Sequence, residues 1–146
     1  MTNRILFVCL GNICRSPTAE GVFRAIAPEI TCESAGTGGW HVGEPPYPPM
    51  QKAAKARGYD LSSLRARQFQ AQDFESFDQI IVMDDNNLQA VEHQRPNGNT
   101  TPVYRLTDYL SDPEWDHVPD PYYTREFDLT LTIIERALEK LHSTLP

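Results

Sequence analysis

The sequence of 146 residues is poor in cysteine, in basic residues and in long hydrophobic runs. Its three cysteines, Cys9, Cys14 and Cys32, lack the spacing of a zinc cluster, and their odd number argues against a secreted disulfide framework. Thirteen basic residues against 20 acidic ones give a net charge of -7, which argues against a nucleic-acid partner. Ile5–Leu10 is too short for a signal peptide, and no apolar run approaches the roughly 20 residues of a membrane span. We therefore expect a cytoplasmic protein with reduced thiols and no bound metal.

Apolar runs of strand length alternate with segments of helical spacing along the chain. We expect strands at Ile5–Val8, Ile30–Ala35, Gln79–Met83 and Val103–Leu106. We expect helices from Ser16 to before Pro28, at Met50–Arg57, at Asn86–His93 and over Phe127–Leu141, with loops at Gly36–Pro49 and Asp108–Tyr123. The first strand is apolar throughout, which suits a strand buried on both faces. The alternation predicts a single α/β domain, a doubly wound four-stranded parallel sheet flanked by helices, with ligands at the carboxyl ends of its strands.

Local signals mark the ends of the predicted helices. Ser16 suits the N-cap of the first helix, with Pro17 at its first position. Asp84 or Asp85 suits the cap of the helix after the third strand, and Gly58 suits a left-handed residue after the second helix.

The segment CLGNICR, residues 9–15, joins the first strand to the first helix. A helix N-terminus offers unpaired amides at the positive end of the helix dipole, and together these favour an anion. Gly11 permits close backbone approach or a positive φ, and Asn12 is among the few residues that tolerate the left-handed region. The same field favours the nucleophilic thiolate of Cys9. Arg15 provides a planar fork that can bind two phosphoryl oxygens.

The segment therefore predicts a phosphate-binding loop after the first strand, with Cys9 as its nucleophile. The loop comprises Leu10, Gly11, Asn12, Ile13, Cys14 and Ser16 in addition to Cys9 and Arg15. The Ser16 hydroxyl can steady the thiolate as it leaves phosphorus, besides capping the helix. The alternative is that Cys9 and Cys14 are small buried residues and Arg15 is a solvated charge.

Transfer of a phosphoryl group from a phenol also needs a proton for the leaving oxygen. The acidic loop before the last helix offers four candidates, Asp108, Asp112, Asp116 and Asp120, which the residues alone do not separate. Three aromatic residues on loops, Trp40, Tyr122 and Tyr123, can form the walls of a slot deep enough for phosphotyrosine and too deep for phosphoserine. His41, beside Trp40, is placed to touch the substrate.

Cys9–Pro17 resembles the signature loop of the low-molecular-weight protein tyrosine phosphatases. The resemblance covers essentially the whole chain, because further matching segments follow in the same order: Ser34–Thr37, Trp40, Ala66–Gln68, Met83–Asp84 and Asp120–Tyr123. It implies one phosphatase domain over residues 1–146 that needs no metal or other cofactor. It also implies a monomeric or weakly associating enzyme that hydrolyses phosphotyrosine in proteins through a phosphocysteine and releases inorganic phosphate.

The resemblance also implies roles for individual residues. Asp120 would be the general acid that protonates the tyrosine oxygen and then, as a carboxylate, takes a proton from water. Asn12 and Ser34 would bond to each other and hold the loop in shape, with Asp84 as further support. Cys14 would be the redox partner that shields Cys9 from irreversible oxidation by forming a disulfide.

The chain departs from the family pattern at two positions. Leu64 stands where many members have a histidine shortly before Ala-Arg-Gln, and Glu44 lies in a loop whose sequence tunes the choice of partner.

Three alternative functions are an arginine phosphatase of the same fold and, in different classes, an arsenate reductase and a non-catalytic phosphate-binding module. Arsenate reductases of this fold add cysteines after the third strand, where this chain has none. Arginine-phosphate phosphatases commonly carry a threonine in place of Ile13, so the isoleucine and the paired tyrosines favour an aromatic substrate. A phosphate-binding module without catalysis would lack Cys9, Arg15 or Asp120, and all three are present.

Overall fold

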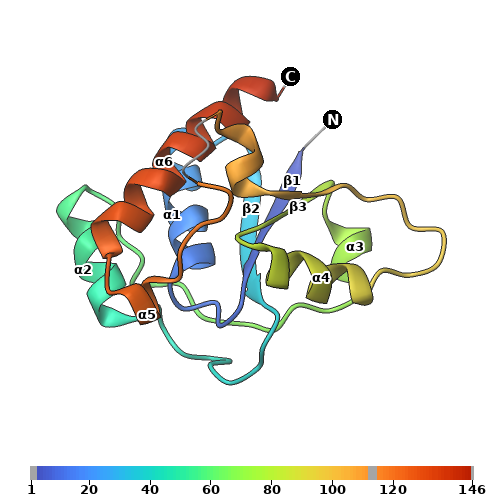
Figure 1. Ribbon diagram of the computed structural model, residues 1–146, viewed down its shortest axis with the longest axis horizontal. Helices are drawn as coiled ribbons and strands as arrows, with labels where there is room; N and C mark the ends of the chain where they lie inside the picture. The colour runs from blue at the N-terminus through green and yellow to red at the C-terminus, as the bar shows by residue number, and fades with distance from the viewer. Residues whose placement is uncertain (1–2, 112–114, 146) are drawn as a thin grey trace.

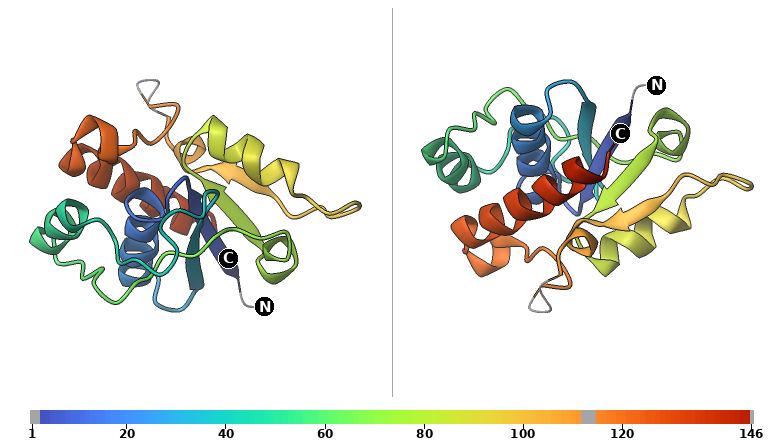
Figure 2. Two further views of the ribbon diagram at one scale, coloured as in Figure 1. Left: turned by 90° about the horizontal axis from the view of Figure 1, so that it is seen from below. Right: turned by 90° about the horizontal axis from the view of Figure 1, so that it is seen from above.

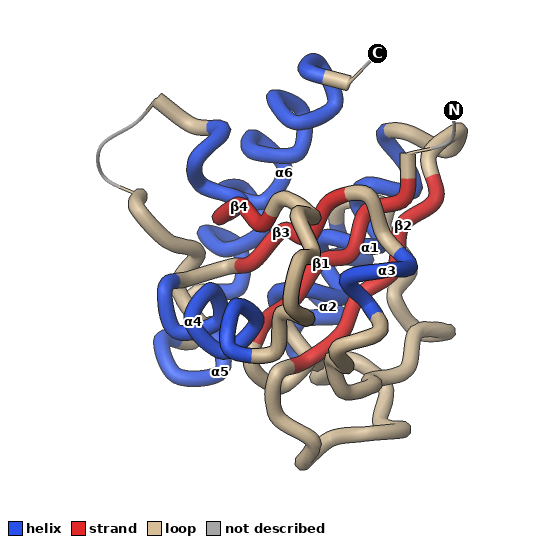
Figure 3. The backbone as a smooth tube through the Cα atoms, turned by 90° about the vertical axis from the view of Figure 1, so that its right-hand side faces the viewer, coloured by secondary structure: helices blue, strands red, loops and turns tan. Residues whose placement is uncertain are grey.

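A computed structural model describes residues 3–111 and 115–145. Its four strands are β1 (Arg4–Cys9), β2 (Thr31–Gly36), β3 (Gln79–Val82) and β4 (Val103–Arg105). All neighbouring pairs are parallel, in the order β2-β1-β3-β4, so β1 lies at the centre beside β3 (Figure 3). The predicted fold class is confirmed.

Helices cover both faces of the sheet. They are α1 (Arg15–Ile26), α2 (Pro48–Ala56), α3 (Asp73–Ser76), α4 (Asp85–His93), α5 (Pro121–Thr124) and α6 (Phe127–Thr144), with a 3-10 helix, η1, at Leu106–Tyr109. The helices α1 and α6 lie on one face with α2 packed against α6, and α3 and α4 lie on the other (Figures 1 and 2). Within the described residues, no helix is both long and apolar enough to cross a membrane.

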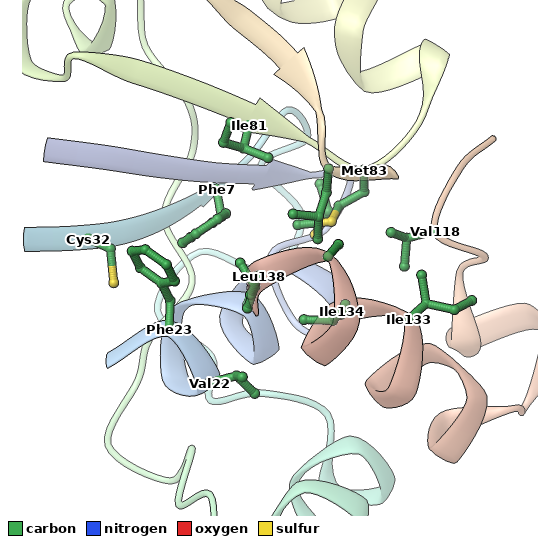
Figure 4. Close-up of a cluster of buried hydrophobic side chains, with 14 of the residues drawn as sticks. Phe7, Val22, Phe23, Cys32, Ile81, Met83, Val118, Ile133, Ile134 and Leu138 are labelled. Atoms are coloured by element: carbon green, nitrogen blue, oxygen red, sulfur yellow. The ribbon is translucent and has the colours of Figure 1, made fainter. Parts of the chain in front are cut away.

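The alternation of side chains along β1 explains why its run is apolar throughout. Phe7 belongs to the core between the sheet and helices α1 and α6, where its ring meets Phe23 edge to face with centroids 5.7 Å apart (Figure 4). Leu6 and Val8 belong to the second core beneath α3 and α4. Because successive strand residues point to opposite faces, a central strand covered on both sides needs apolar residues at every position. The pairing of β1 with β2 and β3 places Cys9 at the carboxyl end of the strand, opposite Gly36.

The start of α1 differs from the prediction. The helix begins at Arg15 with Cys14 at the N-cap position, and no side chain caps it. Ser16 therefore lies inside the first turn, and Pro17 follows it at the third position. The Ser16 hydroxyl bonds instead to Cys9 and Asn12, so it is unavailable to the helix amides. The prediction that Ser16 caps the helix was wrong, whereas Asp84 does cap α4 by accepting from the amide of Asn87 at 2.8 Å.

The predicted loop Asp108–Tyr123 contains regular structure at both ends. The helix η1 overlaps its start and α5 its end, and α3 was not predicted either. Each of these elements has four residues, which is too short for an apolar stripe to repeat. The predicted left-handed glycine after α2 is confirmed, since Gly58 has a φ of 92°.

Candidate active site

The loop between β1 and α1 is held from outside through its carbonyl groups. Amides of segment 37–47 donate to the carbonyl oxygens of Cys9, Leu10 and Ile13 at 2.9, 2.9 and 2.7 Å. The hydroxyl of Thr18 donates to the carbonyl of Cys14 at 2.7 Å. Because these carbonyls bond outwards to the scaffold, the loop is left with its amide groups on the inner side.

Several of these amides are available to an anion. Among the residues the structure describes, the amides of Gly11, Ile13, Cys14 and Arg15 donate to no protein acceptor. The side chains of the last three are buried, and buried donors without an acceptor are costly. An anion that accepts from them at the N-terminus of α1 also meets the positive end of the helix dipole.

Hydrogen bonds of the Asn12 side chain connect the loop to β2 and to the segment that contains Arg67. The φ of Asn12 is 57°, so the left-handed residue of the loop is Asn12, and Gly11 has no positive φ. The side-chain Nδ2 of Asn12 donates to Ser16 Oγ at 2.7 Å and to Ser34 Oγ at 3.0 Å, and its side-chain Oδ1 accepts from the backbone amide of Arg67 at 2.9 Å. The expected Asn12–Ser34 hydrogen bond is present. Gly11 serves close approach instead, because a Cβ there would lie 3.2 Å from the His41 ring.

The two thiols of the loop have different environments. Cys9 Sγ accepts from the backbone amide of Asn12 at 3.2 Å and lies 3.0 Å from Ser16 Oγ. Burial raises the pKa of the Cys14 thiol, and the negative charges of Cys9 and Asp120 raise it further. At neutral pH Cys14 therefore stays protonated, which makes it a poor nucleophile. Cys32 lies buried on β2, where burial raises its pKa to about 12.

Arg15 is buried with three oxygen partners. Its Nη1 donates to Asp84 Oδ2 at 2.7 Å and to the carbonyl of Val118 at 3.0 Å, and its Nη2 donates to Asp120 Oδ2 at 3.5 Å. Burial lowers the pKa of Arg15, but the charges of Cys9, Asp120 and Asp84 outweigh it and raise the pKa overall. The guanidinium is thus a fixed cation beside Cys9.

Of the four candidate acids, Asp120 lies beside the loop between β1 and α1, where it contacts Arg15. It caps α5 by accepting from the amide of Tyr122 at 3.1 Å, and it lines the same cavity as Cys9. Asp108 pairs with Arg105 and Asp116 with His117, away from that cavity. Asp112 lies outside the described residues.

The cavity is a slot of about 260 Å³. It is lined by Cys9, Leu10, Gly11, Ile13, Cys14, Arg15, Trp40, His41, Asp120, Tyr122 and Tyr123. Trp40 and Tyr123 are 71% and 72% exposed, so these aromatic rings stand at the rim and not in the core. The slot is therefore polar at its base and aromatic at its mouth, which suits an aryl group that carries an anion.

Sequence reasoning missed Glu20, which lies behind the loop. Its side chain is only 8% exposed, its Oε1 accepts from Ser34 Oγ at 2.6 Å, and its Oε2 lies 2.5 Å from Arg24. Burial raises the pKa of Glu20, while the Ser34 hydrogen bond and the Arg24 charge act in the opposite direction. Leu64, which replaces the family histidine, lies beside Glu20 and Ser34 in one surface hollow. The Leu64 side chain offers no hydrogen bond, and the Ser34 hydroxyl donates to the carboxylate of Glu20.

The fold and the loop together define an α/β protein with a loop that contains Cys9 and Arg15 and carries amides available to an anion at the carboxyl ends of its strands. The sequence pattern of the family described as low molecular weight phosphotyrosine protein phosphatase matches residues 4–146. The chain belongs to this family.

Individual relatives agree with this assignment. The low molecular weight protein-tyrosine-phosphatase YfkJ of Bacillus subtilis is 41% identical over 147 residues, which cover 97% of this chain and 94% of that protein. The crystal structure of YfkJ has a TM-score of 0.93 at 40% identity and covers 99% of this chain and 94% of that one. The crystal structure of DARP, a Drosophila arginine phosphatase, has a TM-score of 0.89 at 30% identity over 97% of this chain and 98% of that one.

Proposed function

We propose that this protein hydrolyses phosphotyrosine in phosphoproteins, with Cys9 as nucleophile, Arg15 as phosphate clamp and Asp120 as general acid and base. Membership of the family makes it a hydrolase of phosphoric monoesters. The observation that carries the assignment of roles is the convergence of Cys9, Arg15 and Asp120 on one slot with aromatic residues at its mouth.

The first step transfers the phosphoryl group to sulfur. The Cys9 thiolate attacks phosphorus, the bond between phosphorus and the phenolic oxygen breaks, and the Asp120 carboxyl gives its proton to that oxygen. The three non-bridging oxygens accept from the loop amides and from Arg15, which need no rearrangement because the scaffold already holds them. The products of this step are a phosphocysteine and the free tyrosine side chain.

The second step returns the enzyme to its starting state. Water attacks phosphorus while the Asp120 carboxylate takes one of its protons, and the bond between phosphorus and sulfur breaks. Ser16 Oγ, 3.0 Å from Cys9 Sγ, donates to the departing thiolate. Inorganic phosphate leaves, and Cys9 and Asp120 are again thiolate and acid.

The remaining roles rest on the same contacts. Asn12 and Ser34 hold the loop, Asp84 orients Arg15, and Trp40, Tyr122 and Tyr123 wall the slot. Cys14 lines the slot with Cys9 as a free thiol, which supports its role as redox partner. We further propose that the protein acts in the cytoplasm, in keeping with its free cysteines, and that it is a monomer or weak dimer, as the family resemblance implies.

The test compares three phosphorylated peptides, carrying phosphotyrosine, phosphoserine or phosphoarginine, in the presence of a metal chelator. We expect cleavage of the phosphotyrosine peptide alone. Cys9→Ser abolishes turnover, and Asp120→Asn lowers kcat by about 10² to 10⁴, which is the usual contribution of general acid catalysis. The matched control is Asp116→Asn, which removes a carboxylate outside the slot and leaves kcat unchanged.

Two results would contradict the proposal. Preferential cleavage of phosphoarginine would assign the protein to the activity named for DARP and overturn the argument from Ile13. Binding of phosphate without cleavage of any of the three peptides would make the loop a binding module.

A further inference from the structure

The residue that follows α5 has an unusual backbone conformation. Arg125 has a φ of 63° and a ψ of 14°, in the left-handed region. For a residue other than glycine this conformation costs roughly 1–2 kcal/mol. Such strain persists only where the surroundings hold it, and it gathers at ligand sites.

Aromatic groups hold the Arg125 side chain in place. Its Nη1 donates to Tyr47 Oη at 3.0 Å and to the carbonyl of Tyr122 at 3.5 Å. Its guanidinium carbon lies 5.4 Å from the centroid of the Tyr47 ring and 5.2 Å from that of Phe127, within the range of cation–π attraction. A long side chain that is fixed in this way loses little further entropy when it binds a ligand.

The same contacts put the guanidinium beside the mouth of the slot. The rings of Tyr47 and Tyr122 lie 5.1 Å apart, and Tyr122 lines the slot. Burial is the main reason why the pKa of Cys14 is raised, and the Arg125 charge opposes this rise. The charge of Arg125 therefore reaches a group that lines the slot.

Arg125 is exposed, and no carboxylate among the described residues lies within ion-pair distance of it. This is notable in a chain with a net charge of -7, in which many other arginines are paired. At the other lining segment of the slot, His41 is already engaged by Glu44 at 3.0 Å. Of Arg125 and His41, two basic residues at the mouth of the slot, Arg125 therefore has hydrogen-bond donors left for an incoming anion.

We infer that Arg125 forms a recognition subsite for a carboxylate of the substrate protein, the side chain of an Asp or Glu close in sequence to the phosphotyrosine. The inference rests on the proposed phosphatase activity and names the substrate class that the slot prefers. A guanidinium presents its donors in a planar fork that matches a carboxylate, and Arg125 is exposed, with its hydrogen bonds to Tyr47 and Tyr122 both made by Nη1. Glu44, which contacts the slot residue His41, carries the same charge as such a residue and would not attract it.

The experiment uses the whole protein and pairs of phosphotyrosine peptides that differ by Glu or Gln at one position, from three residues before to three after the phosphotyrosine. At one or more positions, we expect the wild type to show a kcat/KM about two- to tenfold higher for Glu, the range of a partly exposed charge-assisted contact. In Arg125→Asn this ratio falls to about one. Asparagine keeps the left-handed backbone favourable, so the change removes the cation and not the turn.

Two further measurements make the test sharper. Arg125→Glu should invert the ratio, and raising the salt concentration should lower the wild-type ratio because the contact is near solvent. The matched control is Arg65→Asn, an exposed arginine outside the slot, which should keep the wild-type ratio.

Hydrolysis of a small aryl phosphate distinguishes failure of the proposed phosphatase activity from failure of the proposed Arg125 subsite. If the wild type does not cleave p-nitrophenyl phosphate, the proposed activity is overturned and this inference with it. If it cleaves that substrate but the Glu to Gln ratio is one at every position, or is the same in Arg125→Asn, the inference alone is overturned.

Discussion

Two buried polar side chains, Asn12 and Glu20, determine how firmly the loop is held. Asn12 bonds to Ser16, Ser34 and the backbone of Arg67, and Ser34 in turn donates to Glu20. The chain of hydrogen bonds runs from the thiol of Cys9 through Ser16, Asn12 and Ser34 to the carboxyl of Glu20. Each side chain in this series provides a hydrogen-bond partner for the next. A buried network whose polar groups all have partners favours a single arrangement of its side chains.

Glu20 should give the protein a stability that depends on pH. Because burial raises the pKa of Glu20 in the folded state, the folded protein holds this proton to a higher pH than the unfolded chain does. The free energy of unfolding therefore falls as pH rises from the unfolded pKa through the folded one. Glu20→Gln removes this fall. Urea denaturation at pH 4 and pH 7 should show the variant gaining stability relative to the wild type at the higher pH.

The exposed Glu75 provides the control for this measurement. Glu75→Gln should follow the wild type at both pH values, since its side chain lies at the surface. An equal stability difference between Glu20→Gln and the wild type at pH 4 and pH 7 would show that Glu20 titrates alike in the folded and unfolded states.

The sequence identifies the residues that carry chemistry better than those that support them. Cys9 and Arg15 follow from the strand, loop and helix that surround them, because a phosphate site needs a nucleophile and a cation at a helix N-terminus. Asp120 required the family resemblance, because four aspartates compete in one loop and only the fold selects among them. Glu20 was missed because a charged residue on an amphipathic helix normally faces solvent, and only the close packing of α1 on β2 buries it.

At the scale of elements, the junction between β3 and α4 serves the fold and the site together. Asp84 uses Oδ1 to cap α4 and Oδ2 to bind Arg15. The first contact satisfies a helix amide, and the second holds a buried cation. The two roles depend on different properties of the side chain, because capping needs an oxygen acceptor and binding Arg15 benefits from charge.

Substitution of Asp84 should separate these roles. Asn is as good an N-cap as Asp, so Asp84→Asn should keep α4 intact while it weakens the contact with Arg15. We expect kcat/KM for a phosphotyrosine peptide to fall roughly tenfold, as for loss of a charge-assisted hydrogen bond. Asp84→Ala should lose activity similarly and also about 1 kcal/mol of stability from the missing cap. Urea denaturation and steady-state kinetics on both variants provide the check, and wild-type kcat/KM in Asp84→Asn would refute the orienting role.

Long, well-buried helices and strands were easier to predict from the sequence than short ones. The three longer strands and the long helices were found because each repeats its apolar pattern at least once, whereas β4 was found from Val103 and its neighbours between two loops. The boundaries of α1 were misplaced at Ser16, since a serine before a proline has the composition of a cap and here its hydroxyl serves the thiol instead. The short elements η1 and α5 were missed for want of a repeat, although α5 carries Asp120 at its cap and Tyr122 in the slot.

At the scale of the whole molecule, the site joins elements that are far apart in the sequence. Cys9 ends β1, Ser34 lies on β2, Asp84 follows β3, and Asp120 precedes α5. The parallel sheet brings the ends of the first three strands to one edge, and the contacts of Arg15 with Asp84 and Val118 bring the later segment to the same place. A ligand at this point bonds to groups that only the complete fold assembles.

Inorganic phosphate should therefore stabilise the entire fold. A ligand that binds only the native state adds about 1.4 kcal/mol to the free energy of unfolding at ten times its Kd. For a domain of this size that corresponds to a rise in Tm of about 3–6 °C. Thermal unfolding of the wild type with phosphate, and with chloride at equal ionic strength, should show the rise for phosphate alone. Arg15→Met should show none, because the clamp is lost, and an equal rise in that variant would mean that phosphate acts elsewhere on the molecule.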